Sequence, residues 1–399
     1  MHAFLPYGRQ AITDADVDAV ATVLRSDFLT AGPLVERFEH AFADAIGAPH
    51  AVAVSNATAA LHVAVAAAGI RKGDRVVTSP NTFLASANCA AYVGATPDFS
   101  DIDPVSYNLD AAVLERSWKP DTRAVVAVDY AGQSCDMPAI AAVARKNGAL
   151  VIEDACHGVG GAFVHDGAVW KVGSHPWADM TIFSFHPVKT MTTGEGGMIV
   201  TANGEWADRM RRLRSHGIVR NADQFSSIEI PEMTERGPWY HEMQDLGFNY
   251  RLTDLQCALG ISQLARLPEF IKRRRDIVSR YNSGLSGLSW LTTPGLSEPA
   301  NRDHISWHLY TPQFDFRSLG KSRTQVMNDL RDKQIGTQVL YIPVHLQPWY
   351  RKTFGYAPGK CPVAEAYYQR ALSLPLFPSM SDDDVDRVIA AVRGLRTGG

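Results

Sequence analysis

The sequence contains little cysteine and no excess of charge of either sign. Its five cysteines are an odd number without any CxxC spacing, which argues against a disulfide framework or a cysteine zinc site. The 39 basic residues balance 42 acidic ones, for a net charge of −3, so no nucleic-acid partner is expected. The basic run Lys272–Arg275 lies within a helical pattern, and we interpret it as a solvated helix face.

Long apolar runs are also missing. The longest one, Ala57 to Ile70, contains His62 and is too short to span a bilayer. The first ten residues lack the long apolar segment of a signal peptide. We therefore expect a cytoplasmic protein without a membrane partner. A length of 399 residues with 46% hydrophobic content allows a large core and suggests two to three domains.

The first part of the chain alternates helical and strand patterns. Thr13 and Asp16 form a predicted capping box before apolar residues at helical spacing, and Gly47 stands where a second helix would end. Apolar runs between helical segments predict strands at 50–55, 74–79, 96–102, 123–130, 149–155, 179–185 and 196–201. This alternation predicts an α/β fold with a largely parallel central sheet and helices on both faces.

The pattern changes after about Gly247. Thr253 and Gln256 form a capping box that opens a long predicted helix, which should bend near Pro268. Further on, the sequence predicts an apolar segment at 304–314, a helix near 324–334, a strand at 337–343 and a last helix capped at Ser381. We therefore expect a large domain at 1–252 and, at 253–399, a linking helix with a smaller α+β domain. Residues 221–242 are polar and irregular and predict an excursion loop.

Two segments place polar groups at the ends of predicted strands, where open α/β sheets bind ligands. In Ser55–His62 a strand turns into a helix, whose first N–H groups make an anion site to which Thr58 adds a hydroxyl. An ordinary helix cap would have the same pattern. Glu153 and Asp154 end a buried strand and should point to opposite faces. A buried carboxylate needs a partner, and a cation is favoured because no metal-ligand spacing surrounds the pair.

The third segment is SFHPVKTMTTGEGG, in which Lys189 follows the strand end at Ser184 by five residues. A lysine in a loop is usually a solvated charge. The three segments together, however, supply an anion pocket, a buried carboxylate and an amine at one edge of a sheet. Pyridoxal 5′-phosphate (PLP) needs these groups for its phosphate, its ring nitrogen and its aldehyde. The combination therefore favours a PLP site.

The sequence resembles the DegT/DnrJ/EryC1/StrS sugar aminotransferases from about Phe4 to the segment LSLPLFP near the C-terminus. The resemblance rests on SNATAALH, SPNTFLASANCAAYVGATPDFSDID, VIEDACHGVGG, SFHPVKTMTTGEGG and LGFNYRLTDLQCALGISQLARLPEFIKRRR. The sequences of SFHPVKTMTTGEGG, YIPVHLQPWY and AEAYYQRALSLPLFP are most similar to one subgroup, the UDP-4-amino-4,6-dideoxy-N-acetyl-β-L-altrosamine transaminases of pseudaminic acid synthesis. The family resemblance implies a type I PLP-dependent transferase fold, with PLP bound by the large domain.

The resemblance also implies roles for single residues. Lys189 and Asp154 would be catalytic: Lys189 would bind the cofactor aldehyde covalently, and Asp154 would pair with the ring nitrogen. Asn249 would reach the cofactor phosphate of a neighbouring subunit, with Arg251 beside it, which implies a homodimer with shared active sites. The other cofactor contacts would come from Ala57, Thr58, Phe83, His157 and Ser184. The nucleotide-sugar would meet Tyr7, Asp27, Phe28, Leu29, Thr30 and Tyr341. No metal is expected.

His157 departs from the family pattern, because many members carry glutamine there. The subgroup named above also tends to have histidine, so the departure favours it and leaves open how the cofactor hydroxyl is contacted. A satisfied buried histidine is the alternative for His157, and His186 and His308 are expected to be structural. Core packing is the alternative for Phe83 and for the aromatic residues assigned to the sugar.

The implied reaction moves an amino group from L-glutamate to C4 of a UDP-linked 4-keto-6-deoxy-N-acetylhexosamine of the L-altro series. A related enzyme acting on UDP-4-keto-6-deoxy-N-acetylglucosamine is the alternative within the family. A dehydratase branch carries histidine at the lysine position, and Lys189 argues against it. A non-catalytic sensor of a phosphorylated ligand is the alternative from another class, and the presence of both Lys189 and Asp154 argues against it.

Overall fold

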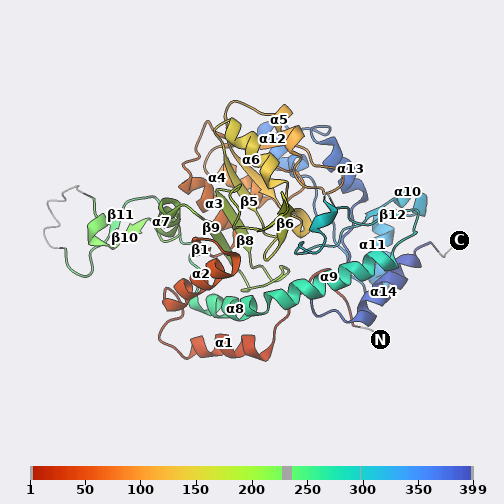
Figure 1. Ribbon diagram of the computed structural model, residues 1–399, viewed down its shortest axis with the longest axis horizontal. Coiled ribbons are helices and arrows are strands. Elements are labelled where there is room, and N and C mark those ends of the chain that lie inside the picture. The colour runs from red at the N-terminus through yellow and green to blue at the C-terminus, as the bar shows by residue number, and fades with distance from the viewer. Residues whose placement is uncertain (1–2, 227–235, 297, 397–399) are drawn as a thin grey trace.

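The computed structural model describes residues 3–226, 236–296 and 298–396. A central sheet is enclosed by helices, and a thin arm that carries β10 and β11 reaches away from the body (Figure 1). No helix in these ranges is both long and apolar enough to cross a membrane.

The central sheet has seven strands in the order β1-β9-β8-β5-β4-β2-β3. The strands from β8 to β3 pair in parallel, whereas β9 is antiparallel to both of its neighbours. The largely parallel sheet is thus confirmed, and each predicted strand of the first part exists. The bounds are β1 (His50–Val54), β2 (Arg75–Thr78), β3 (Thr96–Phe99), β4 (Thr122–Val128), β5 (Leu150–Asp154), β8 (Met180–Ser184) and β9 (Gly197–Thr201).

Helices cover both faces of the sheet, as the continuous apolar strands predict. Along β1, Val52 and Val54 pack with α3 (Ala57–Ala67), α4 (Ala85–Tyr92) and α7 (Gly204–Leu213). The alternate residues Ala51 and Ala53 face α2 (Pro33–Ile46) and α8 (Asp254–Ala265) on the other side. On that side α5 (Ala111–Arg116) and α6 (Met137–Lys146) cover β2, β4 and β5. The period of two along each strand therefore builds two apolar layers.

Local signals set several helix ends. The capping box of Thr13 and Asp16 opens α1 (Asp14–Leu24), as predicted. Gly47 ends α2 with φ +89°, a left-handed conformation that glycine adopts without strain. The sequence analysis did not predict the hairpin of β6 (Ala162–His165) and β7 (Ala168–Lys171). The predicted loop at 221–242 begins after β10 (Ile218–Val219), which pairs with β11 (Glu242–Met243), and its residues 227–235 lie outside the described ranges.

The long helix predicted after Thr253 forms with a break. Thr253 and Gln256 cap α8, and α9 (Leu267–Gly284) starts after Arg266 with a proline in its first turn. The expected helices α11 (Arg323–Asp332) and α14 (Asp382–Arg393) also form, each with a capping box. The remaining elements of this part are β12 (Leu291–Thr292), β13 (Gln313–Phe314), α10 (Phe316–Leu319), α12 (Pro348–Phe354) and α13 (Pro362–Arg370).

The strand predicted at 337–343 is wrong. This segment makes an isolated bridge between Gln338 and Ser373, and Pro343, which lacks an N–H, stands at its end. Of the apolar segment at 304–314, only Gln313 and Phe314 form a strand, which pairs with β12. Most apolar residues of the two segments pack into the core without belonging to a sheet.

The interpretation of residues 272–275 as a solvated face is wrong for Arg274. Its side chain is fully buried, and Nη1 donates to the carbonyls of Trp307, His308 and Leu376 at 3.4, 3.2 and 3.0 Å. Burial lowers the pKa of Arg274 to about 9.

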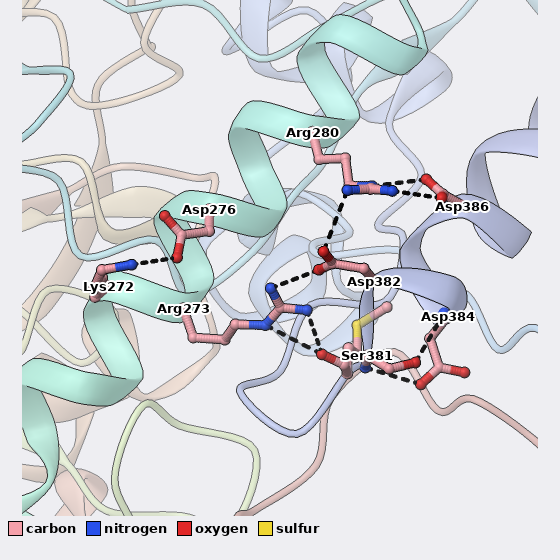
Figure 2. Close-up of polar contacts among 9 residues, drawn as sticks. Lys272, Arg273, Asp276, Arg280, Ser381, Asp382, Asp384 and Asp386 are labelled. Atoms are coloured by element: carbon pink, nitrogen blue, oxygen red, sulfur yellow. Dashed lines mark hydrogen bonds and ion pairs between the residues drawn. The ribbon is translucent and has the colours of Figure 1, made fainter.

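On the outer side of α9, an ion-pair network joins this helix to α14. Arg273 pairs with Asp382, and Arg280 pairs with both Asp382 and Asp386 (Figure 2). Arg273 of the basic run and Arg280, one turn or more further along α9, therefore link this helix to the C-terminal helix.

Candidate active site

A cavity of about 710 Å³ opens where β4, β5 and β8 end, next to the start of α3. Strand ends of a parallel sheet share one edge, so residues far apart in sequence converge there. The larger part of the sequence-predicted site lines this cavity, namely Tyr7, Ala57, Thr58, Phe83, Asp154, His157, Ser184, Lys189 and Tyr341.

The N-terminus of α3 forms one wall. The side chain of Asn56 caps the helix by accepting a hydrogen bond from Ala59 N–H at 2.8 Å. The other N–H groups of the first turn, at Ala57 and Thr58, have no helical carbonyl to bind and favour an anion. A Cβ on Gly197 would lie 2.6 Å from the carbonyl carbon of Asn56, so a side chain there would displace this turn.

Asp154 ends β5 and is only 4% exposed. Its Oδ2 accepts a hydrogen bond from Ser86 Oγ at 2.6 Å, and its Oδ1 accepts one from Cys156 N–H at 3.3 Å. Ser86 in turn lies 2.7 Å from the hydroxyl of Thr82. The sequence analysis quoted Ser86 within a family motif but gave it no role, because nothing local in the sequence indicates its contact with Asp154.

Lys189 lies in the turn after β8, where its N–H donates to the carbonyl of His186 at 2.8 Å. Burial lowers the pKa of the Lys189 amine, and the nearby Cys156 and Asp154 oppose this shift by favouring the cation. A lowered pKa increases the fraction of neutral amine, which is the form that attacks a carbonyl or accepts a proton.

Glu153 points away from the cavity, as the strand alternation predicts. It is fully buried, and its oxygens bind His175 Nε2 at 3.1 Å and Thr181 Oγ1 at 2.8 Å. Of the two adjacent carboxylates, therefore, Asp154 alone serves the cavity. No group of three or more metal-ligating side chains occurs in the part of the chain that the structure describes.

His157 is a buried part of the cavity wall. Ala131 N–H donates to its Nδ1, and its Nε2 lies 3.2 Å from the hydroxyl of Tyr341. Its ring centroid is 4.4 Å from that of His308. Burial, aided by the charge of Lys189, holds the pKa of His157 well below its usual range. His157 thus has satisfied partners and also lines the cavity.

The aromatic side chains of the cavity differ in exposure. Phe83 is 58% exposed, so the alternative of core packing is wrong for this residue, and its ring centroid lies 6.2 Å from that of Tyr341. Tyr7 and Tyr341 are half-buried, and burial raises the pKa of both hydroxyls, so each remains a phenol.

Some of the predicted site residues lie outside the cavity of this chain. Asn249 is exposed and forms a bridge with Ser215, although its neighbour Tyr250 does line the cavity. Residues 27–30 lie beside the start of α8, where the carbonyl of Leu29 accepts a hydrogen bond from Asp254 N–H at 3.1 Å. The side chains of Phe28 and Leu29 are 54% and 46% exposed.

The cavity fits PLP by its donor set. An amine, a carboxylate held by Ser86 and a helix N-terminus face one space, which is large enough for the cofactor and for part of a substrate. Lys189 would hold the aldehyde, Asp154 the ring nitrogen, and Ala57, Thr58 and Ser184 the phosphate.

Comparisons with known proteins agree with this chemistry. The model of the DegT/DnrJ/EryC1/StrS aminotransferase family matches residues 10–393. The spore coat polysaccharide biosynthesis protein SpsC of Bacillus subtilis is 44% identical over 99% of this chain and 98% of its own length.

Solved structures show the same fold. Helicobacter pylori PseC, described as an aminotransferase involved in the biosynthesis of pseudoaminic acid, has a TM-score of 0.88 with 28% identity, over 99% of this chain and 100% of that one. The PLP-form of Spr1654 from Streptococcus pneumoniae has a TM-score of 0.87 with 28% identity, over 99% of both chains. The protein is therefore a member of the DegT/DnrJ/EryC1/StrS family, the PLP-dependent sugar aminotransferases.

Proposed function

We propose that the protein transfers an amino group from L-glutamate to C4 of a UDP-linked 4-keto-6-deoxy-N-acetylhexosamine of the L-altro series, a step toward pseudaminic acid. The observation that carries the aminotransferase chemistry is the meeting of Lys189, Asp154 and the start of α3 in one cavity. Support for the choice of sugar comes from the similarity to PseC and from the resemblance of the segment SFHPVKTMTTGEGG to the subgroup that acts in pseudaminic acid synthesis.

In this proposal each residue has a distinct task. When bound, PLP supplies an aldehyde for a covalent link to amines and a ring that accepts electrons from the reacting carbon. With PLP bound, the amine of Lys189, whose pKa is lowered, would serve first as a general base and then as a general acid. Asp154 would hold the proton of the ring nitrogen, and Ser86 fixes the orientation of its carboxylate.

We also propose that two chains share their active sites. Asn249 is exposed on the surface, and so are the apolar side chains of Met243, which belongs to β11, and of the nearby Trp239 and Leu246. β10 and β11 form a projecting arm (Figure 1). Large exposed apolar side chains on a projecting arm favour burial against another protein surface. A second copy of the chain would use this arm and place Asn249, together with residues 27–30, at the neighbouring cavity.

An acceptor screen tests the choice of sugar. Purified protein with L-glutamate is offered UDP-linked 4-keto and 3-keto sugars, and NMR identifies the aminated products. The ratio of kcat/KM for the L-altro and D-gluco 4-ketones decides between the two family alternatives. Because the two sugars differ in configuration rather than in functional groups, fit alone separates them by about 1–3 kcal/mol, so some activity on both is expected. A preference for the D-gluco ketone would contradict the proposed sugar and leave the aminotransferase assignment intact.

A further inference from the structure

The hydrogen bonds around His157 determine which of its ring nitrogens carries the proton. Ala131 N–H points at Nδ1 of His157 at a distance of 3.2 Å. A backbone N–H can only donate, so Nδ1 must be the acceptor and carries no hydrogen. This contact excludes the doubly protonated ring, and the remaining hydrogen of the neutral imidazole lies on Nε2.

This tautomer sets the direction of the next hydrogen bond. Nε2 of His157 lies 3.2 Å from the hydroxyl oxygen of Tyr341. Because Nε2 carries the hydrogen, the histidine donates and the tyrosine oxygen accepts. The single hydrogen of the Tyr341 hydroxyl is then left for another acceptor, and within the described residues the hydroxyl makes no second hydrogen bond.

The position of Tyr341 leaves the cavity as the place for that acceptor. Its ring lies nearly parallel to the His157 ring, with an angle of 17° and a centroid distance of 6.2 Å, and Phe83 borders it on the cavity side. The hydroxyl of Tyr130 holds the backbone by donating to the carbonyl of Leu340 at 2.6 Å. Since His157 is only 5% exposed, bulk water does not compete for its hydrogen bond.

We propose that Tyr341 donates a hydrogen bond to an oxygen of the molecule bound in the cavity, and that His157 is the positioning residue that imposes this direction. The acceptor is either the oxygen of the hydroxyl group on the PLP ring or an oxygen of the sugar. The tautomer of His157 follows from this chain alone, whereas the identity of the acceptor rests on the proposed function.

The first test uses the cofactor-free protein. ¹⁵N chemical shifts of the imidazole nitrogens distinguish the two tautomers, and His157→Gln identifies the His157 signals. We expect the form with hydrogen on Nε2, unchanged between pH 6 and 8. A hydrogen on Nδ1, or a ring that becomes doubly protonated in this range, would overturn the proposal. This result does not depend on whether the protein turns over any sugar.

The second test removes the donor. Tyr341→Phe keeps the ring and deletes the hydroxyl, and the loss of one hydrogen bond predicts a fall of about 3- to 10-fold in a binding or kinetic constant. A weaker affinity of the cofactor-free protein for PLP identifies the cofactor oxygen as the acceptor. A raised KM for the sugar with unchanged PLP affinity identifies a sugar oxygen. If neither constant changes, the proposal is wrong. Tyr368→Phe is the matched control, because that hydroxyl makes no hydrogen bond within the described residues and lies outside the cavity lining.

The third test separates a positioning role from a merely structural one. In His157→Gln, the amide oxygen can accept from Ala131 N–H and the amide nitrogen can donate to Tyr341, so values within about 2-fold of the wild type are expected. His157→Leu removes both contacts and should match Tyr341→Phe, and the double variant should be no worse than either one. Additive losses in the double variant would contradict the proposal that His157 acts through the hydroxyl of Tyr341. If His157→Leu does not fold, the comparison of His157→Gln with Tyr341→Phe still tests the proposal, since the first variant should keep the wild-type constants and the second should lose affinity for PLP or for the sugar.

Discussion

Ser86→Ala should weaken catalysis without touching any group that reacts. Ser86 Oγ and Asp154 Oδ2 lie 2.6 Å apart, and the two residues are 1% and 4% exposed. The carboxylate also accepts a hydrogen bond from Cys156 N–H, at 3.3 Å. The substitution therefore deletes the shorter of these two bonds, which hold the proposed acceptor of the ring nitrogen in place.

The size of the effect follows from the charge of the acceptor. A hydrogen bond to a charged group contributes about 1.5–3 kcal/mol, which corresponds to a loss of about 10- to 150-fold in kcat/KM. Ser86 gives its hydrogen to Asp154, so Thr82, at 2.7 Å, must donate to Ser86. Thr82→Val removes this second, neutral hydrogen bond and should cost only about 2- to 10-fold.

The assay is steady-state kinetics with L-glutamate and the best acceptor, together with the affinity of the cofactor-free protein for PLP. Ser117→Ala is the control, since its hydroxyl binds the carbonyl of Val113 on an exposed helix away from the cavity. Wild-type kinetics in Ser86→Ala, or a larger loss in Thr82→Val than in Ser86→Ala, would refute the reasoning.

Four further predictions concern the proposed catalytic groups and the shared site. Lys189→Ala should abolish transamination, whereas its circular dichroism spectrum should match that of the wild type and the contacts to the PLP phosphate should remain. Asp154→Asn should lose most of the rate because a neutral amide cannot hold the ring nitrogen protonated. Unchanged turnover in either variant would contradict the role of the substituted residue. In the cofactor-free protein, labelling of Lys189 by an amine reagent should rise with pH along a titration curve whose midpoint lies below pH 10.5, because burial lowers its pKa, and the unfolding free energy should increase with pH between the folded and unfolded pKa values; a midpoint at or above 10.5 would contradict the shift. Co-expressed Lys189→Ala and Asn249→Ala chains should regain activity at one site of each hybrid dimer, and inactive hybrids would exclude a shared site that uses Asn249.

The sheet was predictable because its signals are local. The parallel strands are four to seven residues long and, except for β3 (TPDF), contain a run of apolar residues. Helix starts such as Thr13 and Thr253 carry their capping partners three residues away. Residues 337–343 gave the same apolar signal for a different reason. They pack irregularly beside the cavity, and no property of the segment itself distinguishes that burial from the burial of a strand.

The candidate site divides in the same way. Lys189, Asp154 and the start of α3 lie at or just after strand ends, so their convergence could be predicted because open α/β sheets bind ligands there. The partners of these groups could not be predicted, because they come from distant segments. Ser86 reaches Asp154 across 68 positions, and Tyr341 reaches His157 across 184. Only the packing of the whole chain brings each hydroxyl group to its partner.

The two ends of the chain supply the other side of the cavity. Leu376 N–H donates to the carbonyl of Tyr7 at 3.0 Å, and the bridge between Gln338 and Ser373 holds the segment that leads to Tyr341. Both tyrosines are thus positioned by the C-terminal part of the chain, which α9 and α14 hold together (Figure 2). The positions of Lys189, Asp154 and the start of α3 depend on the central sheet, whereas the positions of Tyr7 and Tyr341 depend on the C-terminal packing. Substitutions in that packing can therefore shift the two tyrosines while the groups at the strand ends stay in place.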